Sequence, residues 1–250
     1  MLKILYNYLV NIKFEFMNAI KKKCLSENIK LIDSNLCFQN FGNVSLKIDK
    51  DNFVIKPSGI NLKKVNYRDF PIININNGRV MDGKLKPSSD TDTHLLLYKK
   101  FKKINSIAHT HSKYATSWAQ SKKEIPILGT THADYWNIAI PVTKDLIKKE
   151  IVNNYEHNTG EKIIDLIQNK NINYVNCPGV LVANHGPFTW GISHELAVKN
   201  AEILEYVAYL AFKTVMLNPK SSINIEMVKK HFNRKHGRDS YYGQNKNTSK

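Results

Sequence analysis

Residues 106–120, SIAHTHSKYATSWAQ, combine two sequence patterns that meet at a pair of histidines. The apolar residues at the start of this stretch predict a β-strand over 104–112, and the segment 112–122 predicts a helix. Successive side chains of a strand point to opposite faces of a sheet, so His109 and His111 would project together. Two neighbouring imidazoles suit a metal ion, although two structural histidines explain the H-x-H pattern about equally well.

The rest of the chain alternates between further strand-like and helix-like segments. Short hairpins occur as well as longer crossovers, and turn residues separate the segments. The pattern therefore indicates an α/β domain. The other expected strands cover 42–48, 52–59, 70–75, 80–81, 124–128 and 179–186, and the other expected helices cover 17–28, 90–101, 143–155, 158–170, 193–217 and 225–236.

A third histidine, His185, ends the apolar segment GVLVANHG and directly precedes Gly186. Strand ends are where α/β proteins present functional groups, and glycine lets the backbone turn sharply behind such a group. Asp90 begins an expected helix and offers a carboxylate. Three histidines and one carboxylate form a plausible Zn²⁺ set, and Co²⁺, Mn²⁺ or Ni²⁺ would also fit.

Two Lys-Pro-Ser turns, KPSG at 56–59 and KPSS at 86–89, each lie next to a structured segment. Serine hydroxyls, a lysine charge and backbone N–H groups near a glycine suit an anion such as a phosphate group. No G-x-x-x-x-G-K-[ST] sequence is present, so a nucleotide-binding P-loop is not indicated. Each turn alone is most simply an ordinary turn, but two of them beside a candidate metal set favour an anion site.

The formal net charge of +16 suggests an anionic partner. Nearly all of the basic residues are lysines, and arginine occurs only at positions 68, 79, 234 and 238. Proteins that read or track nucleic acid use more arginine, interleaved with aromatic residues. We therefore expect no nucleic-acid partner, and attribute the charge to a solvated surface that also suits a small phosphorylated substrate.

The cysteines, at positions 24, 37 and 177, are odd in number and form no C-x-x-C pair. We expect them to be core residues of a protein in a reducing compartment. The apolar N-terminal segment is too short to span a membrane, and no cleavage site follows it. We therefore predict a soluble, cytoplasmic protein with no membrane partner. Residues 1–16 are interpreted as an extension, 17–244 as the domain and 245–250 as a disordered tail.

Seven motifs follow one another along the chain: GNVS, KPSG, KPSSDT, HTHS, GTTHADY, HGPFTWG and RKHGRDSYYGQ. Together they resemble the class II aldolase/adducin-like family, and within it the ketopentose-phosphate 4-epimerases. The resemblance covers residues 17–244, and the strings GTTHADY and HGPFTWG are its most specific part. It implies a single α/β domain with a central, mostly antiparallel sheet and helices on both sides, assembled into a homotetramer with active sites between subunits.

The same resemblance implies roles for individual residues. It implies one divalent ion per subunit, Zn²⁺ or another divalent metal, and a phosphorylated ketopentose as substrate. By position in the motifs, the metal ligands are Asp90, His109, His111 and His185, the phosphate-binding residues are Asn43, Lys56, Ser58, Gly59, Ser88 and Ser89, the acid/base residues are Asp134 and Tyr242, and the supporting residues are Glu156 and His231.

Inversion of C4 in a ketopentose phosphate calls for these kinds of group. The C4 hydrogen is not adjacent to the ketone, so its removal would give a carbanion with no carbonyl to delocalise it. Deprotonation of the C4 hydroxyl instead lets the C3–C4 bond break into an enediolate and an aldehyde, which turns before the bond reforms. This route needs a Lewis acid, two proton-transfer groups and a firm hold on the phosphate.

Three other functions remain as alternatives. A class II sugar-phosphate aldolase of the fuculose-phosphate type would release the two fragments, but aldolases that resemble this family tend to carry Glu in place of Asp90. A non-catalytic adducin-like interaction domain should have lost metal ligands, and here the set is present. A nucleic-acid binder would rest on charge alone. The sequence favours the epimerase, supplied with substrate by either arabinose or ascorbate breakdown.

Overall fold

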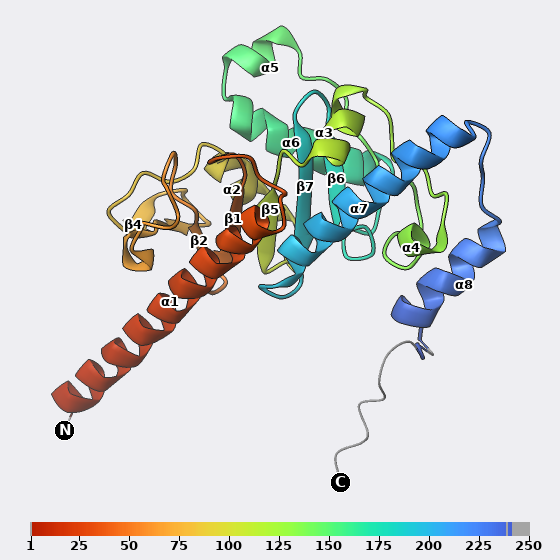
Figure 1. The fold of residues 1–250 in the computed structure, drawn as a ribbon. Coiled ribbons are helices and arrows are strands. Elements are labelled where there is room, and N and C mark those ends of the chain that lie inside the picture. The colour runs from red at the N-terminus through yellow and green to blue at the C-terminus, as the bar shows by residue number, and fades with distance from the viewer. Residues whose placement is uncertain (1, 239, 242–250) are drawn as a thin grey trace.

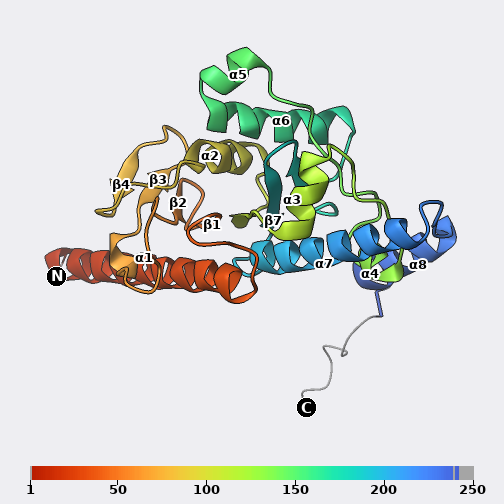
Figure 2. The same ribbon diagram turned by 45° about the horizontal axis from the view of Figure 1, so that its top comes forward.

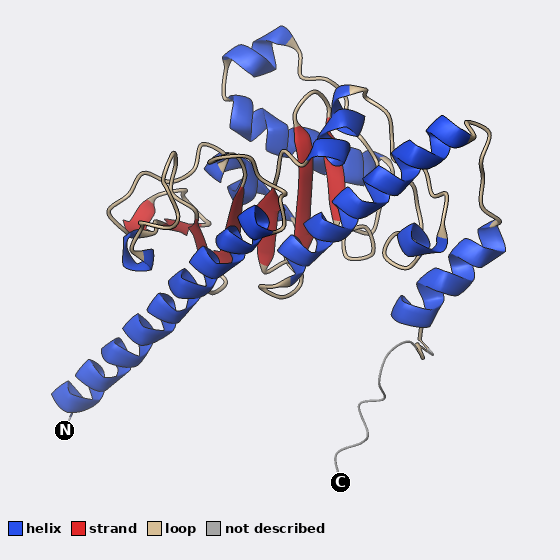
Figure 3. Cartoon of the chain, in the orientation of Figure 1, coloured by secondary structure: helices blue, strands red, loops and turns tan. Residues whose placement is uncertain are grey.

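The computed structural model describes residues 2–238, 240 and 241, and its centre is a seven-stranded β-sheet (Figures 1 and 3). The strands are β1 (Asn43–Lys47), β2 (Asn52–Ile55), β3 (Ile72–Asn74), β4 (Val80–Asp82), β5 (Ser106–His109), β6 (Gly179–Val182) and β7 (Gly186–Gly191). Their order is β4-β3-β2-β1-β5-β7-β6, and each pairs antiparallel with its neighbours. The predicted mostly antiparallel sheet is confirmed.

Helices cover both faces of this sheet, as predicted. The helices are α1 (Leu2–Asp33), α2 (Thr91–Lys100), α3 (Lys113–Gln120), α4 (Thr130–Ala133), α5 (Lys148–Val152), α6 (Tyr155–Asn169), α7 (Leu196–Leu217) and α8 (Ile225–His236). α1 and α7 lie along one face, and α2 and α6 lie on the other (Figure 2). The short α4 contacts α8 and lies beside the C-terminal half of α7 (Figures 1 and 2).

The central strand β1 carries different residues on its two faces. Val44 and Leu46 are fully buried in an apolar cluster with Cys24 of α1. Asn43 and Ser45 alternate with them and hydrogen-bond with residues of α2 and the turn before it. Because alternation fixes which residues share a face, burial of the apolar face also sets where the polar residues point. The polar face of β1 therefore lies beside the start of α2.

The strand expected over 104–112 is shorter than predicted, because β5 ends at His109. The Thr110 N–H still donates to the Pro187 carbonyl at 3.3 Å, but His111 lies beyond the paired residues. The expected strand therefore ends early, but the expectation that His109 and His111 project together is confirmed, since their ring centroids are 4.9 Å apart. The strand expected over 179–186 ends at Val182, and residues 187–191, for which no strand was expected, belong to β7.

Two other expected elements also differ from the structure. Segment 124–128 is not a strand, since Pro126 has no N–H to donate and the segment makes only an isolated bridge. The helix expected over 143–155 is reduced to the short α5. Ile147 and Ile151 are exposed there, so this segment has little apolar surface to bury against the body.

The helix expected to begin at residue 17 begins instead at Leu2. Side chains 11–16 are exposed, and Asn18 is the first buried one after them. The buried Lys21 then anchors α1, because its ammonium donates to the carboxylate of Asp82 at 2.8 Å. The N-terminal turns of α1 extend away from the sheet (Figure 1). The division at residue 17 remains a prediction that this packing supports.

The described part of the chain contains no helix that is both long enough and apolar enough to cross a membrane. The three cysteines are free thiols, and Cys24 and Cys177 are buried. These two behave as the small core residues that the sequence analysis expected, and burial raises the pKa of the Cys177 thiol to about 12.

Removal of residues 1–16 should leave the fold intact, because the described side chains just before residue 17 are exposed. We expect the midpoint of thermal unfolding to change by less than about 2 °C. Removal of residues 1–24 is the matched control, since it also removes Lys21 and Cys24, and it should lower the midpoint clearly. Equal losses from both deletions would show that the extension is part of the folded domain.

Asn28 joins α1 to the start of β1, and its replacement by alanine should destabilise the protein. Its side chain is 2 % exposed and accepts the Val44 N–H at 2.7 Å while donating to the Cys24 and Val44 carbonyls at 2.8 and 3.2 Å. Asn28→Ala leaves the Val44 N–H without this acceptor, which should cost about 1–3 kcal/mol in urea unfolding. The exposed Asn137→Ala serves as control and should change stability by less than about 0.5 kcal/mol.

Candidate functional site

A pocket of about 260 Å³ opens where the ends of β1, β5 and β7 meet the first residues of α2 and α6. It brings together most of the residues singled out in the sequence, although they come from segments far apart in the chain. Its lining consists of Asn40, Phe41, Gly42, Asn43, Lys56, Ser58, Gly59, Ser88, Ser89, Asp90, His109, His111, Tyr155, Glu156 and His185.

Three imidazoles meet at one end of this pocket. His109 ends β5, His111 follows it, and His185 precedes β7. The ring centroids lie 4.9 Å apart for the first and second rings, 4.5 Å for the first and third, and 5.1 Å for the second and third. Each ring contributes one nitrogen to a group of three nitrogens that all lie within 4.8 Å of one another. A single ion could therefore contact all three rings.

Antiparallel pairing of β5 with β7 places the first of these rings. His109 is the pairing partner of Phe188, and the two rings stack with centroids 4.1 Å apart. The His109 Nδ1–H donates to the Pro187 carbonyl at 3.0 Å, which leaves the Nε2 lone pair directed toward His111, whose Nε2 is 3.0 Å away. A side chain on Gly186 would come within 2.6 Å of the Thr110 carbonyl, so the strands can approach this closely only with glycine there.

Burial keeps the three imidazoles neutral. It lowers the pKa of His109 well below its ordinary value, and repulsion from the other two rings adds to this effect. Burial also lowers the pKa values of His111 and His185, while the nearby charge of Asp90 opposes that change. Neutral imidazoles keep the lone pairs that bind a metal, so three of them fit Zn²⁺ as a donor set.

Asp90 lies beside the histidines but outside the group of three ligand atoms that could share an ion. Its carboxylate accepts a hydrogen bond from the Asn43 amide at 2.6 Å, and the same amide donates to the Ser88 hydroxyl at 3.1 Å. Asn43 therefore holds the carboxylate and the second Lys-Pro-Ser turn together. Asp90 is thus close to the candidate ligands, and its role as a fourth ligand remains a prediction.

The two Lys-Pro-Ser turns pair with each other across the mouth of the pocket. The Ser58 N–H donates to the Lys86 carbonyl at 2.9 Å, and the Ser88 N–H donates to the Lys56 carbonyl at 3.0 Å. Gly59 follows with a φ of +62°, a conformation that favours glycine. Lys56 is 5 % exposed, and burial lowers its pKa. The two turns thus form one polar cradle, and the Lys56 amine donates to the Asn40 carbonyl at 2.9 Å.

Two other predicted residues form a separate cluster between α4 and α8. The Asp134 carboxylate accepts hydrogen bonds from Arg234 Nε at 3.0 Å and Nη2 at 2.7 Å, and from His231 Nδ1 at 3.0 Å. Burial opposes ionisation, but these bonds and the charge of Lys235 outweigh it and hold the pKa of Asp134 below its ordinary value. Neither Asp134 nor His231 lines the pocket, and Tyr242 lies outside the described residues.

Several side chains near the site carry no signal in the sequence. Tyr155 lines the pocket with its hydroxyl 3.3 Å from His185 Nδ1, and burial raises the pKa of this phenol. The fully buried His94 bonds through Nδ1 to the Ser45 hydroxyl at 2.7 Å, and burial lowers its pKa to about 3. His132, two residues before Asp134, contacts the Ile138 carbonyl at 3.1 Å.

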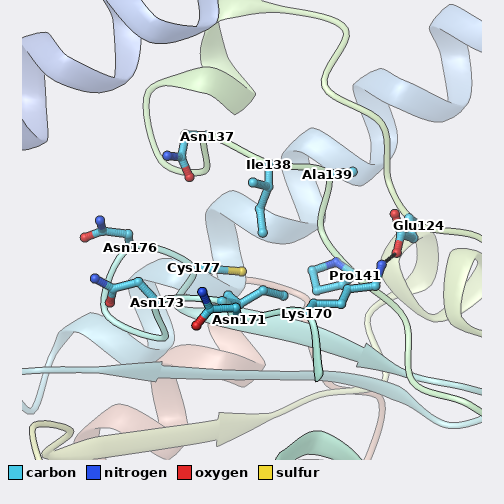
Figure 4. A pocket seen from close by; sticks show the side chains of 11 residues that line it. Glu124, Asn137, Ile138, Ala139, Pro141, Lys170, Asn171, Asn173, Asn176 and Cys177 are labelled. Atoms are coloured by element: carbon cyan, nitrogen blue, oxygen red, sulfur yellow. Dashed lines mark hydrogen bonds and ion pairs between the residues drawn. The ribbon is translucent and has the colours of Figure 1, made fainter. Parts of the chain in front are cut away.

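A larger pocket of about 450 Å³ lies away from the histidines (Figure 4). Its walls come from residues 137–141 and 170–177, and an ion pair between Lys170 and Glu124 closes one side. Asparagine amides and apolar side chains dominate the lining, with no group of metal-binding residues among those that the structure describes. The smaller pocket, where the titratable residues gather, is therefore the better candidate for chemistry.

Comparison with known proteins places these features in a family context. Residues 24–212 match the family described as Class II Aldolase and Adducin N-terminal domain. The chain is 42% identical over 233 residues to the probable L-ribulose-5-phosphate 4-epimerase UlaF of Mycoplasma pneumoniae, covering 92% of this chain and 96% of that protein.

Solved structures share the same fold. An L-fuculose 1-phosphate aldolase is 23% identical with a TM-score of 0.70, over 85% of this chain and 94% of its own. YgbL from Escherichia coli, a putative aldolase/epimerase/decarboxylase, is 19% identical with a TM-score of 0.68, over 85% and 97%. At these identities the likeness concerns the fold alone.

Replacement of His109 by asparagine should remove the metal-binding capacity of the pocket, because it deletes the ring at the centre of the group. We expect Zn²⁺ affinity to fall by at least about 100-fold. Loss of a residue that only hydrogen-bonds to a metal ligand costs up to about this much, and loss of a ligand itself should cost more. Metal analysis after dialysis measures this directly. The exposed His157→Asn is the control and should keep wild-type metal content; full metal content in His109→Asn would refute the ligand role.

Proposed function

The chain belongs to the class II aldolase and adducin family, and from this premise we propose that it is an L-ribulose-5-phosphate 4-epimerase, which interconverts L-ribulose 5-phosphate and D-xylulose 5-phosphate. The observation that carries the proposal is the pocket in which three neutral imidazoles face a cradle of two paired Lys-Pro-Ser turns. A ketopentose phosphate has the two features that such a pocket would hold, an oxygen-rich keto end and a phosphate.

The cradle would hold the phosphate group of the substrate. Lys56 supplies the charge, Ser58 and Ser89 supply hydroxyl groups, and the left-handed Gly59 frees backbone N–H groups to turn toward an anion. Ser89 and Asp90 directly precede α2, so the positive end of the dipole of this helix also faces the pocket. Together these groups would retain the phosphorylated fragment while the other end of the substrate reacts.

The keto end would lie against His109, His111 and His185, which would hold a divalent ion, Zn²⁺ in this proposal, with Asp90 beside it. Such an ion would supply Lewis-acid stabilisation of the negative charge that develops on the ketone oxygen when the C3–C4 bond breaks. The protein's part is to keep the imidazoles neutral and in position.

Proton transfer would come from Asp134 and Tyr242, one for each face of the aldehyde. Asp134 lies in the α4–α8 cluster, outside the pocket of the same chain. We therefore propose that a neighbouring subunit provides this residue, with His231 supporting it and Glu156 at the pocket edge. This arrangement requires an assembly with active sites between subunits, which we take to be a homotetramer.

An aldolase that releases the two fragments is the second candidate, because a solved L-fuculose 1-phosphate aldolase shares the fold. The carboxylate at position 90 is an aspartate, which favours the epimerase over aldolases that carry the longer glutamate. Both reactions begin with the same bond cleavage and differ in whether the aldehyde is retained. The choice therefore concerns the fate of the fragments and leaves the assignment of the pocket unchanged.

Incubation of the purified protein with L-ribulose 5-phosphate, with and without a chelator, tests the proposal. We expect D-xylulose 5-phosphate to form without the chelator and not with it. The products are identified against standards, and His109→Asn should be inactive. Accumulation of dihydroxyacetone and glycolaldehyde phosphate without D-xylulose 5-phosphate would establish the aldolase instead. Absence of turnover by metal-loaded protein would refute the proposed substrate.

A further inference from the structure

Tyr155 contacts the candidate metal centre but has no part in the function proposed above. It is the first residue of α6 and lines the pocket, half-buried. Its hydroxyl oxygen lies 3.3 Å from His185 Nδ1. The two ring centroids are 6.0 Å apart and the planes are tilted by 40°, so the contact is made by the hydroxyl and does not involve stacking.

The contact resembles the one that orients His109 on the opposite side of the group. The Pro187 carbonyl can only accept a hydrogen bond, so it requires hydrogen on His109 Nδ1 and leaves the Nε2 lone pair for a ligand. At His185 the recorded partner of Nδ1 is a side-chain hydroxyl. A hydroxyl oxygen can accept the same hydrogen, and an imidazole that binds an ion through Nε2 carries its hydrogen on Nδ1.

We propose that the Tyr155 hydroxyl is a positioning residue for the metal centre, which accepts the Nδ1 hydrogen of His185 and fixes this ring with Nε2 toward His109 and His111. The inference rests on the metal centre of the proposed function and adds a residue to it. Outer partners of this kind orient a ligand ring, select its tautomer and raise its basicity. A phenylalanine would keep the ring of Tyr155 and lose only this acceptor.

The backbone around Tyr155 is held in place by its neighbours, so the hydroxyl is pre-positioned. Asn154 precedes α6 in the left-handed conformation, with φ 56°. The Thr159 hydroxyl donates to the Tyr155 carbonyl at 2.9 Å, and the Thr93 hydroxyl donates to the Glu156 carbonyl at 2.5 Å. The second bond ties the start of α6 to α2, the helix that follows Asp90. The start of α6, which carries Tyr155, is thereby fixed against the helix that follows Asp90.

Zinc titration of the metal-free full-length protein tests the proposal, with Tyr155→Phe compared against wild type in competition with a chromophoric chelator. We expect the zinc dissociation constant of Tyr155→Phe to rise by about 10-fold or more, within the range that loss of an outer partner produces. Tyr206→Phe is the matched control, because this tyrosine is exposed on α7, and its affinity should equal that of wild type.

Two results would overturn the proposal. One is a zinc affinity of Tyr155→Phe within about twofold of wild type. The other is a metal-free Tyr155→Phe protein that unfolds at a clearly lower temperature than wild type, which would assign the hydroxyl to folding. The zinc titration contains no sugar phosphate. Failure of the epimerase assay would therefore refute the proposed reaction without affecting the zinc affinity or the unfolding temperature measured for Tyr155→Phe.

Discussion

The antiparallel pairing of β5 with β7 is the constraint on which the candidate site depends. It sets His109 against Phe188, brings the Pro187 carbonyl to the Nδ1 side of the imidazole and directs the Nε2 side into the pocket. The register of a strand pair cannot shift by one residue without sending every side chain to the opposite face. The core that fixes this register therefore also fixes the position of His109 in the candidate metal centre, and the glycine at 186 permits the required closeness of the backbones.

Local patterns in the sequence were sufficient to predict the type of most elements, whereas the mostly antiparallel sheet was implied by the family resemblance. The helix over 225–236 and the strand pair near 70–81 correspond to α8, β3 and β4, because turn residues and apolar spacing define them without help from tertiary contacts. The segment 187–191 gave no such signal. It is buried on both faces, so it lacks the alternation that marks a strand with one exposed side.

The histidine group could be anticipated from motifs, but its outer contacts could not. Nothing near position 155 distinguishes a pocket tyrosine from a surface one, since its meeting with His185 depends on how α6 docks beside the β6–β7 turn. The same limit applies to His94 and Ser45, whose contact joins a helix to a strand 49 positions away. For Asp134, sequence motifs indicated chemistry, and only the fold shows that the residue lies outside the pocket of its own chain.

The paired Lys-Pro-Ser turns have a consequence for how one scaffold can support two reactions. Their mutual backbone bonds build the cradle before any anion arrives, so little ordering remains to be done on binding. In a reaction that cuts a sugar phosphate in two, the cradle would act as a pivot for the phosphorylated fragment. The product then depends on two rates: the rate at which the bound aldehyde rotates and rejoins, and the rate at which it dissociates from the cradle. Slow dissociation of the phosphorylated fragment yields an inverted sugar, and fast dissociation yields two separate products. The dissociation rate at the phosphate site, away from the bond that breaks, can therefore decide whether the enzyme is an epimerase or an aldolase.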